Sequence, residues 1–372
     1  MPIFIAALIY KVGIMAGMIP NHQDLLPIYF IGDVLSALGL ALIMTWLYNF
    51  LLKFRQPWEA FLLSSLPFYG SFVFVFTGTF FSHVMSGALL VLAWLAYRDK
   101  KWIIAGIWSG LAFLSEFLLI LIPMVWAAQL LLKEGWKPTA KFAASLVPFG
   151  LFILLYNYVI GGDAFTMLYK YTDNSKDLYG LGVPNADVMF ELLIPDYRGL
   201  LFYMPVCIFL LHRIIKTKKI GLWHFLQHPV FMPCLIYFLA FSSFHDWWGG
   251  WSYGPRQLIP MAMLLVVYGI AGIKSVSYNR LLFYGLTTIG LAMALMAKVT
   301  VIYSLPTDEK HPFFAIICKK FIDQDFNNQH LMHYLFDANA PFSLLVWLLL
   351  FIGLTFLLFL KPQTFQTVKR NE

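Results

Sequence analysis

Residues 341–360 read PFSLLVWLLLFIGLTFLLFL and carry no charged side chain. An apolar run of about 20 residues is long enough to cross a bilayer as an α-helix, because each residue adds about 1.5 Å of helix length. Comparable runs recur along the chain, near 3–19, 28–52, 60–77, 83–97, 102–115, 117–132, 139–160, 199–215, 229–244, 257–273 and 281–303. The pattern predicts an all-α fold, a polytopic transmembrane helical bundle of about 11–12 membrane segments.

The composition favours the same fold class. Hydrophobic residues make up 60% of the 372 positions and charged residues 12%, whereas soluble proteins have about one half and about one quarter. No long polar insertion interrupts the apolar runs, so residues 1–372 are expected to form a single integral membrane domain. The net charge of +7 comes from short basic clusters that membrane orientation explains, so no nucleic acid partner is expected.

The basic clusters orient the predicted bundle. They fall on alternate connections, at Lys53 and Arg55; Arg98, Lys100 and Lys101; Lys133, Lys137 and Lys141; Arg213, Lys216, Lys218 and Lys219; Lys274 and Arg280; Lys361, Lys369 and Arg370. Because basic residues favour the cytoplasmic side, this pattern predicts a cytoplasmic C-terminus, in what we take to be a bacterial inner (plasma) membrane. Two longer extracytoplasmic loops are expected near 161–197 and 304–340, as lids with short surface helices or as structureless spacers.

Glu116 separates two apolar runs, 102–115 and 117–132, that are each shorter than a full span. We expect them to form a helical hairpin that turns near one membrane surface, because the carboxylate at its apex then escapes the hydrocarbon. Within the first run, Gly106 and Gly110 match the GxxxG spacing of closely packed membrane helices. That spacing predicts a packing role for the two glycines.

Ionisable side chains collect on the predicted outer face. They are His83, Glu116, Asp163, Arg198, Asp246 and Arg256. Ionisable groups near membrane depth are costly unless they are paired or face a wet cavity, so they are candidates for one functional site. The alternative is that several of them lie separately in the lipid headgroup region.

Residues 244–260 read FHDWWGGWSYGPRQLIP, which we call the tryptophan-rich motif. Its rings, at Trp247, Trp248, Trp251 and Tyr253, either form an interfacial aromatic belt or line a pocket for a sugar or a lipid headgroup. The motif also holds three glycines, which permit positive φ and a close approach of a ligand to the backbone. This combination favours a binding turn.

Two arginines are candidates for holding an anion. Arg256 precedes an apolar helix, where its planar guanidinium either binds a phosphate with two hydrogen bonds or acts as a snorkelling anchor. Arg198 opens another helix on the same side, as a second cation for an anionic headgroup or as a partner of the neighbouring Asp196. His83 is a further substrate-binding candidate, although a lone histidine is commonly a structural hydrogen-bonding residue.

Glu116 and Asp246 are the candidate catalytic bases, because partial burial would favour the protonated form of a carboxylate. The sequence alone does not rank them. The pairs His245–Asp246 and His330–His333 lack a third ligand, and no HExxH motif or paired cysteine is present, so no metal site is expected. No P-loop, GxGxxG or GxSxG motif occurs either, so no cofactor is expected and the energy must arrive with the substrate.

Four stretches resemble the GT-C superfamily of polytopic glycosyltransferases, in particular the protein O-mannosyltransferase and aminoarabinose transferase group. They are residues 77–88 (TGTFFSHVMSGA), 105–117 (AGIWSGLAFLSEF), 196–205 (DYRGLLFYMP) and 246–260 (DWWGGWSYGPRQLIP), and the last is the most specific. The resemblance implies that a sugar moves from a polyprenyl-phosphate donor to an acceptor on the extracytoplasmic face, with inversion at the anomeric carbon. It also implies phosphate binding by Arg256 and Arg198, and a sugar pocket shaped by Trp247, Trp248 and Trp251.

The chain departs from this family at its start. Family members carry a catalytic aspartate in a first extracytoplasmic loop after an opening helix, and the present sequence begins after the point where both are expected. Asp24 is a remote substitute. Two hypotheses follow: a lipid-phosphate-sugar-dependent glycosyltransferase, as all or most of the enzyme, and a non-catalytic protein that binds or transports lipid-linked saccharide. An unrelated transporter is disfavoured, because no inverted repeat is visible.

Overall fold

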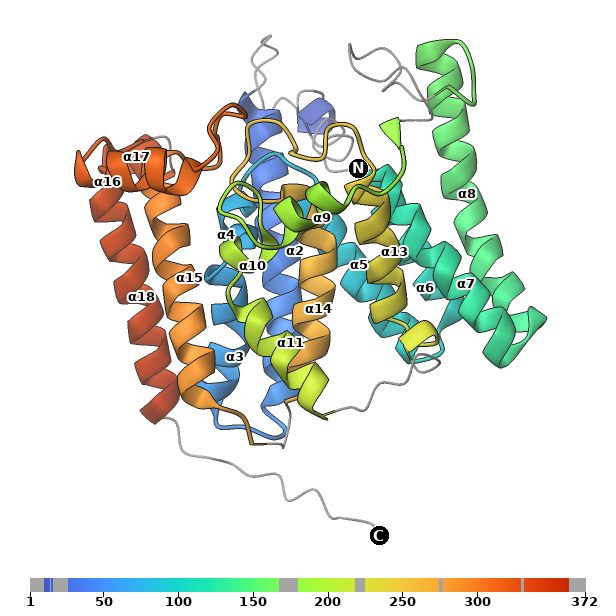
Figure 1. Ribbon diagram of the computed structural model, residues 1–372, viewed down its shortest axis with the longest axis horizontal. Coiled ribbons are helices and arrows are strands. Elements are labelled where there is room, and N and C mark those ends of the chain that lie inside the picture. Colours follow the sequence, from blue (N-terminus) through green and yellow to red (C-terminus); the bar gives the residue numbers. More distant parts are fainter. Residues whose placement is uncertain are drawn as a thin grey trace.

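The structure, a computed structural model, describes residues 10–13, 15, 26–166, 180–217, 225–273, 277–328 and 331–360. All the regular elements in these ranges are helices, and residues Leu181 and Phe244 form an isolated antiparallel bridge. The helices stand side by side in one bundle (Figure 1). The predicted all-α fold is therefore confirmed for the described part of the chain.

Five segments in the described ranges are long and apolar enough to cross a membrane: α2 (Leu26–Leu51, with its span at Ile28–Leu51), η1 and α7 (together Phe117–Glu134), α8 (Trp136–Gly161), α15 (Arg280–Thr300) and α18 (Ala340–Leu360). Shorter apolar helices pack among them: α5 (His83–Arg98), α6 (Trp102–Ser115), α13 (Phe231–Ser242) and α14 (Ile259–Ala271). Their limits follow the apolar runs of the sequence closely, because each run ends where polar or turn-forming residues begin.

Helix α5 lies at the centre of the bundle and packs against α2, α6 and α14. Most of its apolar side chains are buried, with Val84 and Val91 fully inaccessible. On α6, a Cβ at Gly106 would lie 1.8 Å from the Ser145 hydroxyl of α8, and one at Gly110 would lie 2.1 Å from the ring of Phe149. The predicted packing role of the two glycines is thus confirmed.

Two of the predicted continuous helices are interrupted. The run 60–77 divides into α3 (Pro57–Tyr69) and α4 (Phe72–Phe76), because Ser71 caps the second helix by accepting a hydrogen bond from Val73 N. The run 199–215 divides into α10 (Leu200–Tyr203) and α11 (Val206–Thr217) at Pro205, which cannot continue the helical hydrogen bonding. The expectation of one unbroken helix in each run was wrong.

The two long outer segments contain short helices where the structure describes them. The first carries α9 (Ala186–Leu193), and the second carries η5 (Phe313–Cys318), α16 (Lys319–Ile322) and α17 (Leu331–Phe336). Figure 1 shows these elements lying across the upper end of the bundle. Of the two alternatives for these segments, the described parts follow the one with short surface helices.

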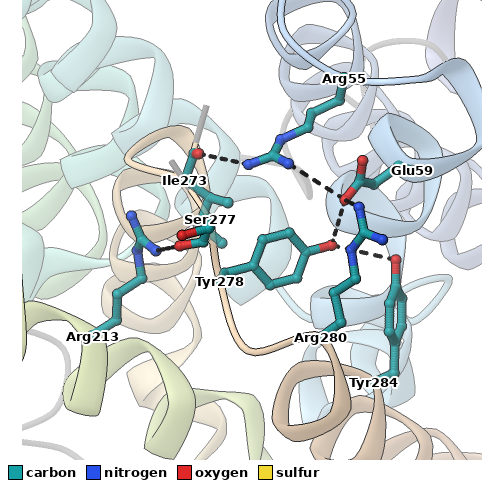
Figure 2. A network of polar contacts seen from close by, with 8 residues as sticks. All are labelled: Arg55, Glu59, Arg213, Ile273, Ser277, Tyr278, Arg280 and Tyr284. Carbon is teal, nitrogen blue, oxygen red and sulfur yellow. Dashed lines mark hydrogen bonds and ion pairs between the residues drawn. The ribbon is translucent and has the colours of Figure 1, made fainter. Parts of the chain in front are cut away.

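A polar network lies at the opposite end of the bundle, where α3 and α15 begin (Figure 1), and Figure 2 shows it from close by. Glu59 is 3% exposed and lies at its centre. Its Oε1 accepts hydrogen bonds from the Tyr278 hydroxyl at 2.9 Å and from Arg280 Nη2 at 3.2 Å. Arg55 Nη1 lies 3.6 Å from the same oxygen. Burial is the main cause that raises the pKa of Tyr278, and the neighbouring Tyr284 and Glu59 raise it further. The hydroxyl of Tyr278 therefore stays a neutral donor. The network ties α3 to the start of α15.

The arginines of this network come from connections that are far apart in the sequence. Arg55 Nη2 donates to the carbonyl of Ile273 at 3.1 Å, and Arg213 Nη2 donates to the carbonyl of Gly272 at 3.1 Å. Both acceptors follow the C-terminus of α14, where cations are electrostatically favoured. Arg55, Arg213 and Arg280 therefore meet at one end of the bundle, as the alternation of basic connections predicts (Figure 2).

Candidate functional site

A histidine and a glutamate form a pair at the end of the bundle opposite to the Glu59 network. His83 begins α5, and Glu116 follows α6 in an extended conformation with φ −153° and ψ 112°. His83 Nδ1 lies 3.0 Å from Glu116 Oε1 and 3.1 Å from Oε2. Each side chain is 12% exposed. Glu116 thus lies at the predicted turn between two helices, where it pairs with a residue 33 positions away.

Neighbouring side chains extend this pair. The Ser86 hydroxyl lies 3.2 Å from Glu116 Oε2 and 2.9 Å from the carbonyl of His83. The ring of Phe81 stacks on that of His83, with centroids 6.1 Å apart and an interplanar angle of 16°. The guanidinium carbon of Arg256 lies 4.4 Å from the centre of the same Phe81 ring. Phe81 therefore contacts both the imidazole of the pair and the guanidinium of Arg256.

The tryptophan-rich motif contributes Arg256 through a tight backbone path. Gly249, Gly250 and Gly254 have φ of 71°, 64° and 69°, which L side chains rarely adopt. A Cβ at Gly249 would lie 2.3 Å from the amide nitrogen of Gln257, and one at Gly254 would lie 2.9 Å from the ring of Tyr203. The predicted glycine-dependent turn is confirmed, and its glycines allow close contact within the protein itself.

Arg198 holds this turn in shape. Its guanidinium donates to the carbonyls of Trp248 at 2.9 Å, Tyr197 at 2.8 Å and Gly250 at 3.2 Å, and the residue is fully buried. Burial lowers the pKa of the guanidinium, and the neighbouring Tyr197 and Tyr203 oppose that change. These contacts give Arg198 a structural role, because its charge is directed at the backbone of the motif.

The aromatic residues of the motif differ in their exposure. Tyr253 is 1% exposed and packs edge to face against Tyr203, with centroids 4.5 Å apart. Trp247 and Trp248 are half-buried, and their rings pack edge to face with centroids 6.0 Å apart. Trp251 is 62% exposed. Tyr253 thus belongs to the protein core, while the three tryptophans present surface that a ligand can reach.

The other predicted carboxylates lie in local turns or outside the described residues. Asp163 accepts hydrogen bonds from Thr166 Oγ1 at 2.6 Å and Phe165 N at 3.1 Å, within the turn that follows α8. Asp246 is half-buried and accepts a backbone hydrogen bond from Gly249 through its carbonyl oxygen. Asp24 lies outside the described residues. Glu116 is therefore the predicted catalytic carboxylate that the structure brings next to His83.

Residues 304–312 cross over the motif from the second outer segment. Leu305 O accepts a hydrogen bond from Ser252 N at 3.1 Å, and Thr307 O accepts one from Tyr197 OH at 2.8 Å. His311 Nδ1 lies 3.0 Å from Asp196 Oδ1. The alternative in which Asp196 pairs with Arg198 is therefore wrong, because the carboxylate has a histidine partner that the sequence did not suggest.

Two charged residues inside predicted spans were missed. Lys298 of α15 donates to the carbonyl of Thr77 at 3.0 Å, at the start of the turn that carries Phe81 and leads to His83. Asp33 of α2 is close enough to Lys298 for their charges to interact. A charge inside an otherwise apolar run was the available indication, because such groups are expensive in a bilayer and are rarely incidental.

An apolar groove of about 410 Å³ lies between α6 and α8. Its lining includes Leu111, Leu114, Phe149, Phe152 and Tyr156. Leu114 is two positions before Glu116 on the same helix end. Leu111 and Leu114 belong to the second half of α6, so the groove lies along the part of that helix that leads to Glu116.

Within the described ranges, no group of three or more His, Cys, Asp or Glu side chains is placed to hold a metal ion. No protein family, no curated protein and no solved structure matches this chain. What the site does must therefore be inferred from its own residues. They supply a paired imidazole, a cation beside an aromatic ring, and accessible indole rings.

Proposed function

We propose that this protein is a membrane glycosyltransferase of the GT-C type, which moves a sugar from a polyprenyl-phosphate donor to an acceptor on the extracytoplasmic face. In this proposal the bundle has about 11–12 membrane segments, two longer extracytoplasmic loops and a cytoplasmic C-terminus, in a bacterial inner membrane. The helices α5, α6, α13 and α14 count as segments although each is shorter than a full span.

One observation carries the proposal. The His83–Glu116 pair and Arg256 meet at Phe81, at the end of the bundle opposite to the basic network around Glu59. Sugar transfer from a lipid phosphate needs a group that takes a proton from the acceptor hydroxyl and a cation beside the phosphate that leaves. This cluster supplies both kinds of group, linked through the ring of Phe81.

The surroundings match the other parts of such a donor. Arg256 would bind the phosphate, because a guanidinium can offer two parallel hydrogen bonds to it. The half-buried Trp247 and Trp248 and the exposed Trp251 offer flat apolar faces to a sugar ring. The groove between α6 and α8 offers apolar surface to a prenyl chain. These features fit a donor with an anionic head and a long apolar tail.

The direct test uses purified protein in lipid nanodiscs, a panel of polyprenyl-phosphate sugars and a cell-envelope fraction as the source of acceptor. We expect the release of polyprenyl phosphate with at least one donor, detected by mass spectrometry. If no donor in the panel is turned over, the proposal fails.

Arg256 provides a second test. Arg256→Ala should weaken the binding of undecaprenyl phosphate at least 10-fold, since a charge-assisted pair is worth about 1.5–3 kcal/mol. Arg280→Ala, at the other end of the bundle, is the matched control, and Lys274→Ala is a second one from the same connection. Equal weakening by Arg256→Ala and the controls would remove the phosphate contact from the proposal.

One observation favours the alternative, a non-catalytic protein that binds or transports lipid-linked saccharide. Glu116 is already engaged by His83 and Ser86, so it is not a carboxylate that faces open space. That protein would bind undecaprenyl phosphate and still lose affinity in Arg256→Ala, but it would release no polyprenyl phosphate from any donor. Turnover therefore separates the two functions.

A further inference from the structure

Glu116 fixes which nitrogen of His83 carries a proton. A carboxylate accepts hydrogen bonds and cannot donate them, so a bond of 3.0 Å to Nδ1 requires the proton on Nδ1. In the neutral ring the lone pair is then on Nε2. The second contact, at 3.1 Å to Oε2, holds the ring against both carboxylate oxygens.

The other nitrogen remains open. His83 Nε2 makes no hydrogen bond to any residue in the part of the chain that the structure describes, although 12% of the side chain is exposed. His228 shows the contrasting arrangement in the same molecule. Its Nε2 lies 3.0 Å from Tyr268 OH, and its Nδ1 accepts hydrogen bonds from Val230 N and Phe231 N. His228, which is 7% exposed, thus uses both ring nitrogens within the fold.

The groups that face His83 come from several elements. Glu116 lies at the end of α6, and Ser86 is one turn further along α5. Arg256, on η4 (Arg256–Leu258), reaches the other side of the cluster through Phe81. Lys298 of α15 holds the start of the turn before His83. His83 therefore lies between a carboxylate and two cationic side chains.

We propose that His83 Nε2 is the proton acceptor of the transfer reaction, and that Glu116 positions His83 without itself taking the proton. This inference rests on the proposed function. The acceptor hydroxyl gives its proton to Nε2 as its oxygen bonds to the anomeric carbon. The bond from that carbon to the phosphate oxygen breaks, and the electron pair leaves with polyprenyl phosphate. The imidazolium, stabilised by Glu116, then returns its proton to water.

A chemical test measures the reactivity of His83 Nε2 in the absence of substrate. Diethyl pyrocarbonate modifies accessible, unprotonated imidazole nitrogens, and peptide mass spectrometry measures the rate at each histidine. We expect His83 to react at least 10-fold faster than the internal control His228, and undecaprenyl phosphate to protect it. Equal, slow modification of the two histidines would overturn the assignment of Nε2.

A kinetic test measures whether turnover depends on His83 Nε2. His83→Asn keeps an amide donor near the position of Nδ1, so the contact with Glu116 survives while Nε2 is lost. We expect turnover to fall at least 100-fold, within the range of about 10² to 10⁴ for general base catalysis. Retention of more than a tenth of wild-type turnover would overturn the inference and leave the proposed function standing. No turnover by the wild type would overturn both.

The positioning role of Glu116 has its own readout. Glu116→Gln still accepts a hydrogen bond from Nδ1 but lacks the charge that stabilises the imidazolium. We expect the acidic limb of the turnover–pH profile to move to lower pH, whereas Ser86→Ala should leave that limb in place. A Glu116→Gln variant with the wild-type profile would show that Glu116 only joins two helices.

Discussion

The two ends of the bundle each contain a carboxylate with little exposure, and the two are used differently. Glu59 is 3% exposed, and one of its oxygens is surrounded by Tyr278, Arg280 and Arg55 (Figure 2). Glu116 is paired with His83, whose second nitrogen has no hydrogen bond within the described residues. The first arrangement satisfies its carboxylate from three sides. The second leaves His83 Nε2 able to accept a hydrogen bond from a ligand.

This difference separates stability from function. Breaking a saturated cluster leaves buried charges and donors without partners, which costs stability. Changing a group that has unused bonding capacity costs little in the empty protein and much when a ligand is present. The comparison can be tested by substitutions at both ends.

The largest loss of stability is expected at Arg198, which holds the turn of the tryptophan-rich motif. Arg198→Met leaves the carbonyls of Trp248 and Gly250 without their donor. Each buried unsatisfied group costs about 1–3 kcal/mol, so we expect a loss of about 4 kcal/mol in unfolding free energy. Thermal unfolding in detergent, followed by tryptophan fluorescence, measures it. Arg213→Met, with its exposed carbonyl contacts, is the control and should lose about 1 kcal/mol.

A change at Glu59, at the opposite end of the bundle, should be smaller and should not reach the site. Glu59→Gln keeps the shape of the side chain and removes the charge that Arg55 and Arg280 face. We expect a loss of about 2 kcal/mol, the upper range for hydrogen bonds to charged groups. The reactivity of His83 with diethyl pyrocarbonate should be unchanged. A variant that altered this reactivity would show that the two ends are coupled.

The helices of both ends were predictable, because an apolar run that ends in polar or glycine-rich sequence limits the choices. The turn at Glu116 was predictable for the same reason. The interruption at Ser71 was not, since it depends on a hydroxyl cap within an apolar run. Charge alternation also placed Arg55 and Arg280 at one end of the bundle, although not their shared contact with Glu59.

The site was only partly predictable, because its contacts join residues far apart in sequence. Composition could identify His83 and Glu116 as candidates, but their bond spans 33 positions and depends on how α5 packs against α6. Arg198 was predicted to bind an anion, and its actual acceptors are carbonyls in a turn about 50 residues later. Lys298 could have been identified from the sequence, since it interrupts an apolar run.

The glycines of the tryptophan-rich motif should show intermediate effects. Gly254→Ala combines a φ of 69° with a Cβ placed 2.9 Å from the buried ring of Tyr203. Gly250→Ala, at a φ of 64°, meets only the end of Arg256 at 3.9 Å. We expect losses of about 2 and about 1 kcal/mol, the difference being the steric term added to the backbone strain. Equal melting temperatures for the two variants would show that backbone strain alone determines both.

The smallest loss of stability is expected at His83. In His83→Asn the amide continues to donate to Glu116, and the residue was only partly accessible, so unfolding free energy should change by less than about 0.5 kcal/mol. Thermal unfolding measures this in the same detergent as the Arg198 variant. A loss of 2 kcal/mol or more would place His83 with Glu59 as a structural group. A small loss, combined with the expected 100-fold fall in turnover, would mean that the open nitrogen of His83 contributes to the reaction and not to the fold.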